Sequence, residues 1–319
     1  MSRVIKIASR TSRLALWQTN TVKTQLEKLG HTCEIVPIET TGDVQLKQPL
    51  YSLGVTGVFT KQLDIALLNN QADIAVHSLK DVPTQLAEGL CLAAVLERGS
   101  SEDVIIIKNK KTVDDVSGKA TIATSSLRRQ AQWLSKYPAH TIVPIRGNVQ
   151  TRLKKFEENN NLDGVIFAKA GLERLDLLPA NSITLDWMLP APAQGIIGIA
   201  CRKEDLELIT ILKKINHHNT YLVGAAERQF LKTLMGGCSV PISAFAQITD
   251  DKIKIEGALH SFDGKQCFRV NESYDLSEGE HCGVLAAKKI MQQNGAAELI
   301  EVIRNKKWDE TNTIRQDAE

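Results

Sequence analysis

Aromatic residues are scarce in this chain, and its charges nearly cancel. Aromatic side chains make up 5% of the 319 residues, and the formal net charge at pH 7 is +2. Proteins that hold single-stranded nucleic acid combine a basic groove with aromatic rings on which the bases stack. The composition therefore argues against a general nucleic-acid-binding protein, and any role for arginine or lysine must depend on local placement.

Long apolar runs and paired cysteine motifs are also missing. No segment approaches the ~20 apolar residues that cross a bilayer, and the N-terminal segment has no apolar stretch long enough for a signal peptide. The six cysteines lie apart, without Cys-x-x-Cys spacing: Cys33, Cys91, Cys201, Cys238, Cys267 and Cys282. This spacing argues against a disulfide framework or a zinc site. We therefore expect no metal, no membrane partner and a reducing, cytoplasmic location.

The chain does contain a regular alternation of apolar strands and helical patterns. Its length allows two or three domains at roughly 100–200 residues each. Short apolar runs followed by helical patterns recur up to residue 200, which is typical of α/β domains. From about residue 242, three alternating strands precede two helices, which is an α+β pattern. The expected strands are 4–8, 33–39, 72–76, 90–96, 104–107, 120–123, 142–145, 164–168, 196–200, 242–248, 252–260 and 266–272.

A polar stretch follows the expected strand 72–76. We expect Ser78, Lys80 and Asp81 to lie on a loop at the carboxyl end of this strand, because Pro83 holds the residue before it extended. Ligands of open α/β sheets bind at that edge. A cation there can fix an anionic group, and a carboxylate can stabilise a nearby cation. The alternative is an ordinary strand-to-loop junction with solvated polar side chains.

Arginines recur in the same place after several strands. The expected strands 120–123, 142–145 and 164–168 are each followed by small or polar residues and then by arginine in the first turns of an expected helix. The helix macrodipole disfavours cations there, so the repetition predicts that these side chains neutralise a bound anion. For any one of them the alternative is a solvated helix residue. The arginines concerned are Arg128, Arg129, Arg146, Arg152 and Arg174.

An arginine also follows the first expected strand. Arg10 follows the strand 4–8, and Ser12 is an expected N-cap of the next helix. Free N–H groups at that helix terminus, together with Arg10, predict a further anion site.

One cysteine stands apart because of its neighbours. Gly236-Gly237-Cys238 follows the expected helix 221–234, and glycine readily ends helices. A glycine-flanked loop can present the sulfur of Cys238 to a cleft, whereas a free cysteine is otherwise a small buried hydrophobe. We expect this second role for the other five cysteines.

Taken in chain order, these motifs resemble the porphobilinogen deaminase (hydroxymethylbilane synthase) family nearly end to end. The resemblance implies two α/β domains like those of periplasmic binding proteins, made of residues 1–98 plus 196–216 and of residues 99–195, with the site in the cleft between them. A smaller α+β domain is implied over 217–319. The segments that carry the resemblance are Arg10-Thr11-Ser12-Arg13-Leu14-Ala15, Thr40-Thr41-Gly42-Asp43, His77-Ser78-Leu79-Lys80-Asp81-Val82-Pro83-Thr84, Thr124-Ser125-Ser126-Leu127-Arg128-Arg129, Arg146-Gly147-Asn148-Val149-Gln150-Thr151-Arg152 and Gly236-Gly237-Cys238.

The resemblance also implies an enzyme, a transferase of tetrapyrrole (haem) biosynthesis that acts as a monomer. Four molecules of porphobilinogen are condensed with loss of ammonia, and hydrolysis then releases linear hydroxymethylbilane. A dipyrromethane cofactor is implied on Cys238, joined through a thioether. Each pyrrole ring carries an acetate and a propionate, so the cleft must hold a polyanion, and the arginine fork suits carboxylates.

Roles for single residues follow from the same resemblance. Asp81 is expected to be the catalytic residue: ionised at neutral pH, it faces the pyrrole nitrogens and stabilises the positive charge that develops as ammonia leaves. The residues expected to hold the cofactor are Ser78, Lys80, Ser126, Arg128, Arg129 and Cys238. The residues expected to bind the incoming porphobilinogen are Arg10, Ser12, Thr124, Arg146, Arg152, Arg174 and Gln194. Leucine in place of Arg128, Arg129 or Arg146 is expected to reduce activity with little loss of thermal stability.

The chain departs from the family in a lid loop, where Ser52 and Thr56 occupy positions that often hold lysine. This departure puts a carboxylate-binding role of the loop in doubt. Two other functions remain open. A two-lobed small-anion binding protein would have the fold without catalysis and would carry no covalent adduct. A nucleic-acid-binding protein would use the arginines of the second strand–helix series and would bind with a strong salt dependence.

Overall fold

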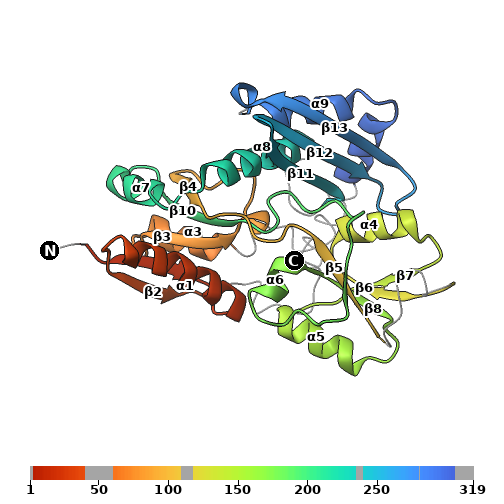
Figure 1. The fold of residues 1–319 in the computed structure, drawn as a ribbon, viewed down its shortest axis with the longest axis horizontal. Coiled ribbons are helices and arrows are strands. Elements are labelled where there is room, and N and C mark those ends of the chain that lie inside the picture. The colour runs from red at the N-terminus through yellow and green to blue at the C-terminus, as the bar shows by residue number, and fades with distance from the viewer. Residues whose placement is uncertain (1–2, 40–59, 109–117, 235–239, 280, 306–319) are drawn as a thin grey trace, which may run out of the picture.

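The computed structural model describes residues 3–39, 60–108, 118–234, 240–279 and 281–305, and these residues form three sheets with their helices (Figure 1). The first two sheets have five strands each, and the third has three. We call the first sheet with its helices the first lobe and the second sheet with its helices the second lobe. The two α/β lobes and the smaller α+β unit agree with the fold class expected from the sequence.

The first lobe has strand order β2-β1-β3-β10-β4 and helices on both faces. On one face α1 contributes Val22 and Leu26 to the core, and on the other α3 contributes Leu63 and Leu67; all four are 0% exposed. Burial on both faces explains why these strands are nearly continuous apolar runs. The elements are β1 (Ile5–Ser9), α1 (Arg13–Lys28), β2 (Cys33–Pro37), α3 (Lys61–Leu68), β3 (Ile74–Ser78), β4 (Leu90–Val95), β10 (Ile197–Arg202) and α7 (Leu206–Lys213).

The second lobe repeats this topology with strand order β7-β6-β8-β5-β9. In each lobe three parallel strands are followed by one strand that is antiparallel to both of its neighbours, β10 in the first and β5 in the second. The short strand β9 was not expected from the sequence, because three residues give no measurable alternation. The elements are β5 (Asp103–Ile107), β6 (Thr121–Ala123), α4 (Leu127–Lys136), β7 (Thr141–Val143), α5 (Val149–Glu158), β8 (Gly164–Ala168), α6 (Lys169–Glu173) and β9 (Ser182–Thr184).

The chain passes twice between the lobes, through residues 96–102 and residues 185–196. The first crossing leads into β5 and the second into β10. At the start of β10, Ile197 pairs with Ser78, the last residue of β3. At the start of β5, Asp103 pairs with Ala168, the last residue of β8. The carboxyl ends of β3 and β8 therefore both lie beside the crossings, where polar residues of the two lobes can meet.

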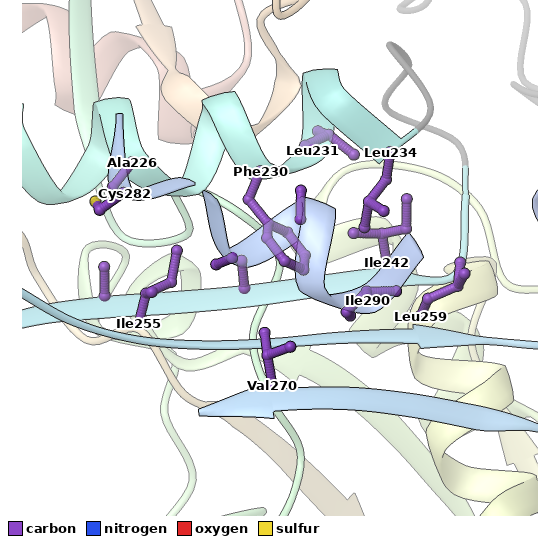
Figure 2. Packing of buried hydrophobic residues seen from close by; sticks show 14 of the residues in the cluster. Ala226, Phe230, Leu231, Leu234, Ile242, Ile255, Leu259, Val270, Cys282 and Ile290 are labelled. Carbon is purple, nitrogen blue, oxygen red and sulfur yellow. The ribbon is translucent and has the colours of Figure 1, made fainter. Parts of the chain in front are cut away.

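The third sheet packs against two helices, as Figure 2 shows. Phe230 of α8 and Ile290 of α9 are fully buried over the sheet, together with Ile255 of β12. Gly257 makes room for the Phe230 ring, since a Cβ at this position would lie 2.3 Å from the ring. The elements are α8 (His218–Leu234), β11 (Ile242–Thr249), β12 (Lys252–His260), β13 (Cys267–Asp275), α9 (Cys282–Met291) and a helix over 296–305.

Several local expectations need correction. Ser78 is the last residue of β3 rather than part of a loop, and Lys80 and Asp81 lie in one turn of 3-10 helix, Leu79–Asp81. Arg146 precedes α5 instead of lying within it. Arg174 is the C-cap of α6, where the macrodipole favours a cation, so its placement gives no argument for a bound anion.

The cysteines also differ from expectation in part. Cys33, Cys201 and Cys282 are buried, and Cys91 is half-buried, whereas Cys267 is exposed on β13 and not a core residue. Cys238 and the lid-loop residues Ser52 and Thr56 lie outside the described residues. No helix in the described part of the chain is long and apolar enough to span a membrane.

Candidate catalytic and anion-binding site

The turn after β3 is fixed at both ends by buried side chains. Leu79 is 1% exposed and Val82 is 2% exposed, and the Val82 N–H donates to the Leu79 carbonyl at 3.2 Å. With these two anchors inside, Lys80 is half-buried and Asp81 is exposed. The Ser78 hydroxyl accepts a hydrogen bond from Gln18 Nε2 of α1 at 2.8 Å. The turn therefore presents its carboxylate outward on a rigid base.

A glutamine on the second crossing connects this turn with the second lobe. Lys80 Nζ donates to Gln194 Oε1 at 3.2 Å. Gln194 Nε2 in turn donates to the Ser101 carbonyl at 2.7 Å and to Asp103 Oδ1 at 2.9 Å. Gln194 is 1% exposed. Since both ends of its amide are bonded, the position of Lys80 depends on that of Asp103.

Asp103, at the start of β5, binds two arginines of α4. Arg128 Nη2 donates to Asp103 Oδ2 at 2.6 Å, and Arg129 Nη2 donates to Asp103 Oδ1 at 2.8 Å. Backbone carbonyls accept from the remaining ends: Leu189 from Arg128 Nη1 at 2.8 Å and Ile166 from Arg129 Nη1 at 3.1 Å. The carboxylate is completely buried and the arginines nearly so. The arginines are thus not solvated helix residues.

Hydroxyl groups define the start of α4. Ser126 is its N-cap and accepts from the Arg129 N–H at 3.4 Å, which satisfies one of the open donors of the first turn. The Ser126 N–H donates to the Thr124 hydroxyl at 3.2 Å. These contacts set the direction in which the helix leaves β6 and so bring Arg128 and Arg129 to Asp103.

The electrostatics of this cluster indicate an excess of positive charge. The pKa of Lys80 is lowered to about 8, chiefly by burial and also by Arg129 and Arg128, while Asp81 and Asp103 oppose the shift. Burial raises the pKa of Asp103, but the two arginines outweigh that effect and leave its pKa below the ordinary value. Asp103 is therefore ionised at neutral pH.

Arg152 of α5 belongs to the same charged group. Its guanidinium lies 4.9 Å from the centre of the Phe167 ring. Its pKa is lowered to about 10, chiefly by burial and also by Arg129, while Asp81 opposes the shift. Four cations of this cluster then face two carboxylates. The cations are Lys80, Arg128, Arg129 and Arg152, and the carboxylates are Asp81 and Asp103.

Among the other expected substrate-binding residues, Arg174 contacts the second crossing. Arg174 Nη2 donates to the Gly195 carbonyl at 2.7 Å, and its guanidinium lies 5.5 Å from the Trp17 ring of α1. Arg10 is close enough to His77 to help lower the pKa of that buried imidazole, whose pKa burial lowers to about 4. Ser12 is the N-cap of α1 and accepts from the Ala15 N–H at 3.4 Å. Arg146 is half-buried before α5.

Sequence reasoning missed Asp103, Gln18 and a second buried carboxylate, Glu227. Glu227 of α8 accepts from Arg98 Nη1 at 2.6 Å, and from the N–H groups of Ala193 and Ala246 at 2.6 and 2.7 Å. It therefore joins the first crossing, the second crossing and the third sheet. The sequence contains one indication that Asp103 is paired, because a carboxylate at the start of an otherwise apolar strand requires a buried partner.

The fold and the site define a class: a two-lobed α/β protein with a cationic site where its lobes meet. Family models place the chain within that class. Residues 5–210 match the model described as "Porphobilinogen deaminase, dipyromethane cofactor binding domain", and residues 221–292 match "Porphobilinogen deaminase, C-terminal domain". The chain belongs to the porphobilinogen deaminase family.

Curated relatives agree over nearly the whole length. The porphobilinogen deaminase of Syntrophomonas wolfei is 40% identical over 308 residues, covering 94% of this chain and 99% of its own. That of Pelotomaculum thermopropionicum is also 40% identical over 308 residues, covering 95% and 98%.

Solved structures give a weaker likeness. The methionine binding protein MetQ is 14% identical with a TM-score of 0.44, covering 70% of this chain and 94% of its own. A YaeC family lipoprotein from Enterococcus faecalis is 15% identical with a TM-score of 0.42, covering 67% and 91%. Similarity at this level carries no conclusion about function.

Proposed function

We propose that the chain is a hydroxymethylbilane synthase, a transferase that condenses four porphobilinogen molecules with loss of ammonia and then releases linear hydroxymethylbilane by hydrolysis. The observation that carries this proposal is the cluster at the lobe junction, where four cations face two carboxylates, one of which is the exposed Asp81. Porphobilinogen and its products carry an acetate and a propionate on each ring. A surplus of partly desolvated cations supplies the affinity that such polyanions require.

The donor set also fits a dipyrromethane with its four carboxylates. Arg128 Nε is a buried donor without a hydrogen-bond partner among the described residues, which is costly unless a ligand supplies an acceptor. The Lys80 ammonium group has three protons, and one of them is used in the hydrogen bond to Gln194 Oε1. When bound, the dipyrromethane would supply the terminal pyrrole to which the first porphobilinogen is joined, and each later one would be joined to the ring added before it. The residues proposed to hold it are Ser78, Lys80, Ser126, Arg128 and Arg129, with Cys238 as its point of attachment.

Asp81 is proposed as the catalytic residue. Its carboxylate is exposed at the top of a turn that Leu79 and Val82 anchor. As ammonia leaves porphobilinogen, positive charge develops on the pyrrole nitrogen, and a carboxylate fixed beside it stabilises the transition state more than the neutral substrate. The residues proposed to bind the incoming substrate are Arg10, Ser12, Thr124, Arg146, Arg152, Arg174 and Gln194.

Further parts of the proposal concern organisation and setting. The proposed domains are residues 1–98 plus 196–216, residues 99–195 and residues 217–319. In support of this division, each of the three sheets has strands from one of these groups of residues. A cytoplasmic location and a monomeric state complete the proposal.

The decisive test is the mass of the purified protein and of its peptides. The proposal requires a dipyrromethane adduct on Cys238 that thiol reductants do not remove, together with consumption of porphobilinogen and release of ammonia. Cys238→Ala should fold but lack both the adduct and the activity. An unmodified Cys238 in active protein would refute the attachment site. A protein that binds porphobilinogen without turnover or adduct would instead be a small-anion binding protein.

A further inference from the structure

An arginine of α8 spans the turn that carries Lys80 and Asp81. Arg228 Nη1 donates to the Val82 carbonyl at 2.8 Å and makes a longer contact with the Leu79 carbonyl at 3.4 Å. Arg228 Nη2 donates to the Pro83 carbonyl at 2.7 Å. The three acceptors stand on both sides of Lys80 and Asp81. One planar guanidinium thus holds the two ends of the turn at a fixed separation.

A backbone hydrogen bond from the Val82 N–H to the Leu79 carbonyl closes the turn. Its Leu79–Asp81 segment is a single 3-10 turn, a geometry with weaker hydrogen bonds than an α-helix. Pro83 has no N–H, so this residue cannot donate to a neighbouring strand. The carbonyls of Val82 and Pro83 follow the end of β3 and accept hydrogen bonds from Arg228. The Arg228 guanidinium therefore adds hydrogen bonds from another helix to those within the turn.

Arg228 is itself held by a firm support. The preceding residue, Glu227, is completely buried and binds Arg98 together with two backbone N–H groups, so α8 cannot rotate at this point without breaking several hydrogen bonds. The helix continues to Leu234, four residues before Cys238. The same helix therefore supports the catalytic turn and leads to the residue proposed to carry the cofactor.

We propose that Arg228 is a positioning residue that fixes the Asp81 carboxylate relative to α8, the helix that precedes Cys238 in the chain. This inference rests on the proposed role of Asp81. It predicts that Arg228 acts on turnover through Asp81 and only weakly on substrate capture. If Arg228 had only a structural role, its replacement would change the stability of the protein. The turn would keep its geometry, because Leu79 and Val82 would still anchor it.

Steady-state kinetics of the holoenzyme provides the first measurement. Arg228→Met removes all three hydrogen bonds, so kcat should fall at least tenfold while KM for porphobilinogen changes less than threefold. Arg228→Lys keeps one donor and should recover part of kcat. Lys232→Met is the matched control, because Lys232 is an exposed cation one turn further along α8, and it should leave kcat unchanged. Unchanged kcat in Arg228→Met would overturn the inference.

A double-mutant cycle separates this inference from the role of Asp81. If Arg228 acts through Asp81, then Arg228→Met should lower turnover by less than twofold in the Asp81→Asn background. A full tenfold loss in that background would show that Arg228 acts elsewhere and would overturn the inference. If Asp81→Asn alone keeps full turnover, the proposed catalytic role of Asp81 fails first.

Hydrogen exchange gives a readout that needs no cofactor. In the Cys238→Ala protein, Arg228→Met should increase the exchange rate of the backbone amides of residues 79–82 at least tenfold, while the strand β3 and the core of the third sheet keep their protection. Lys232→Met should change neither. Equal protection of the turn with methionine or arginine at position 228 would contradict the inference, even if kcat had fallen. If Arg228→Met does not fold, Arg228→Lys carries the same comparison at smaller amplitude.

Discussion

Lys80 Nζ donates to Gln194 Oε1 at 3.2 Å, which joins the turn after β3 to the second crossing between the lobes. The other end of the Gln194 amide donates to Asp103, the carboxylate that binds Arg128 and Arg129. A single side-chain amide therefore connects a buried ion-pair cluster in the second lobe to the turn of the first lobe that carries Asp81.

Asp103→Asn should destabilise the protein strongly. It removes the charge that compensates two buried guanidinium groups, and breaking a buried pair costs about 3–5 kcal/mol. We expect a loss of that order in the free energy of unfolding, measured by chemical denaturation, and poor retention of the cofactor. Asp186→Asn, at an exposed aspartate near the start of the second crossing, is the control and should change stability by less than ~0.5 kcal/mol. Equal stability of the two variants would show that the cluster contributes little.

The arginines should separate into two groups when replaced by leucine. Arg128→Leu and Arg129→Leu each leave Asp103 with one partner, so both should lose thermal stability as well as activity; the expectation of unchanged stability, drawn from sequence, is revised for these two. Arg146→Leu lies outside the Asp103 cluster and should reduce activity at least tenfold, because a charge-assisted hydrogen bond is worth roughly 1.5–3 kcal/mol, with an unchanged melting temperature. Thermal unfolding and porphobilinogen consumption measure the two effects. A normal melting temperature for Arg128→Leu would argue against its structural role.

Asp81→Asn should abolish most turnover while the protein still folds. The substitution keeps the size of the side chain and removes the charge, and a single electrostatic stabiliser is typically worth ~10²–10³ in turnover. Asp81 is exposed, so the melting temperature should stay close to that of the parent. Asp81→Glu keeps the charge at a displaced position and should retain more activity than Asp81→Asn. Parent-like turnover in Asp81→Asn would exclude this carboxylate as the catalytic group.

Lys80 should give the activity a basic limb. Its pKa lies at about 8, chiefly because of burial, so the ammonium loses its proton as the pH rises through that value. A neutral amine no longer attracts carboxylates, and kcat/KM for porphobilinogen should therefore fall above pH 8. Lys80→Arg stays charged and should lack this limb, provided that it assembles its cofactor. The pH profile of kcat/KM from pH 6 to 10 decides the matter, and an identical limb in Lys80→Arg would assign it to another group.

Stability should respond to Lys80 with the opposite sign. The folded-state pKa is lower than the ordinary value of 10.5, so between pH 8 and 10.5 the unfolded chain binds more protons than the folded chain. The contribution of Lys80 to the free energy of unfolding therefore rises with pH across this window, while its contribution to ligand binding declines. Comparing denaturation of the parent and Lys80→Arg at pH 7.5 and 9.5 measures this difference.

Local pattern was sufficient for much of the fold. Buried strands such as Gly164–Ala168 and Lys252–His260 were predicted at their observed bounds, because four or more consecutive buried or alternating residues give a clear period. Predictions were wrong where an element is short, or where the interpretation depended on which end of a helix a residue occupies. Arg174 was expected at the start of a helix, but α6 has five residues and ends at Glu173, which makes Arg174 a C-cap.

By itself the sequence determined the order of strands and helices, the family, and the polar residues that follow β3, β6 and β8, because each of these depends on residues that are neighbours in the chain. Only the tertiary structure decided which of those residues meet. Gln194 joins Asp103 across 91 positions and Lys80 across 114, and Arg228 reaches Val82 across 146. Contacts over such separations depend on how the two crossings and α8 bring the sheets together. Periodicity and spacing do not predict that arrangement. The folded chain was therefore needed to show that Asp103 and Arg228 belong to the site.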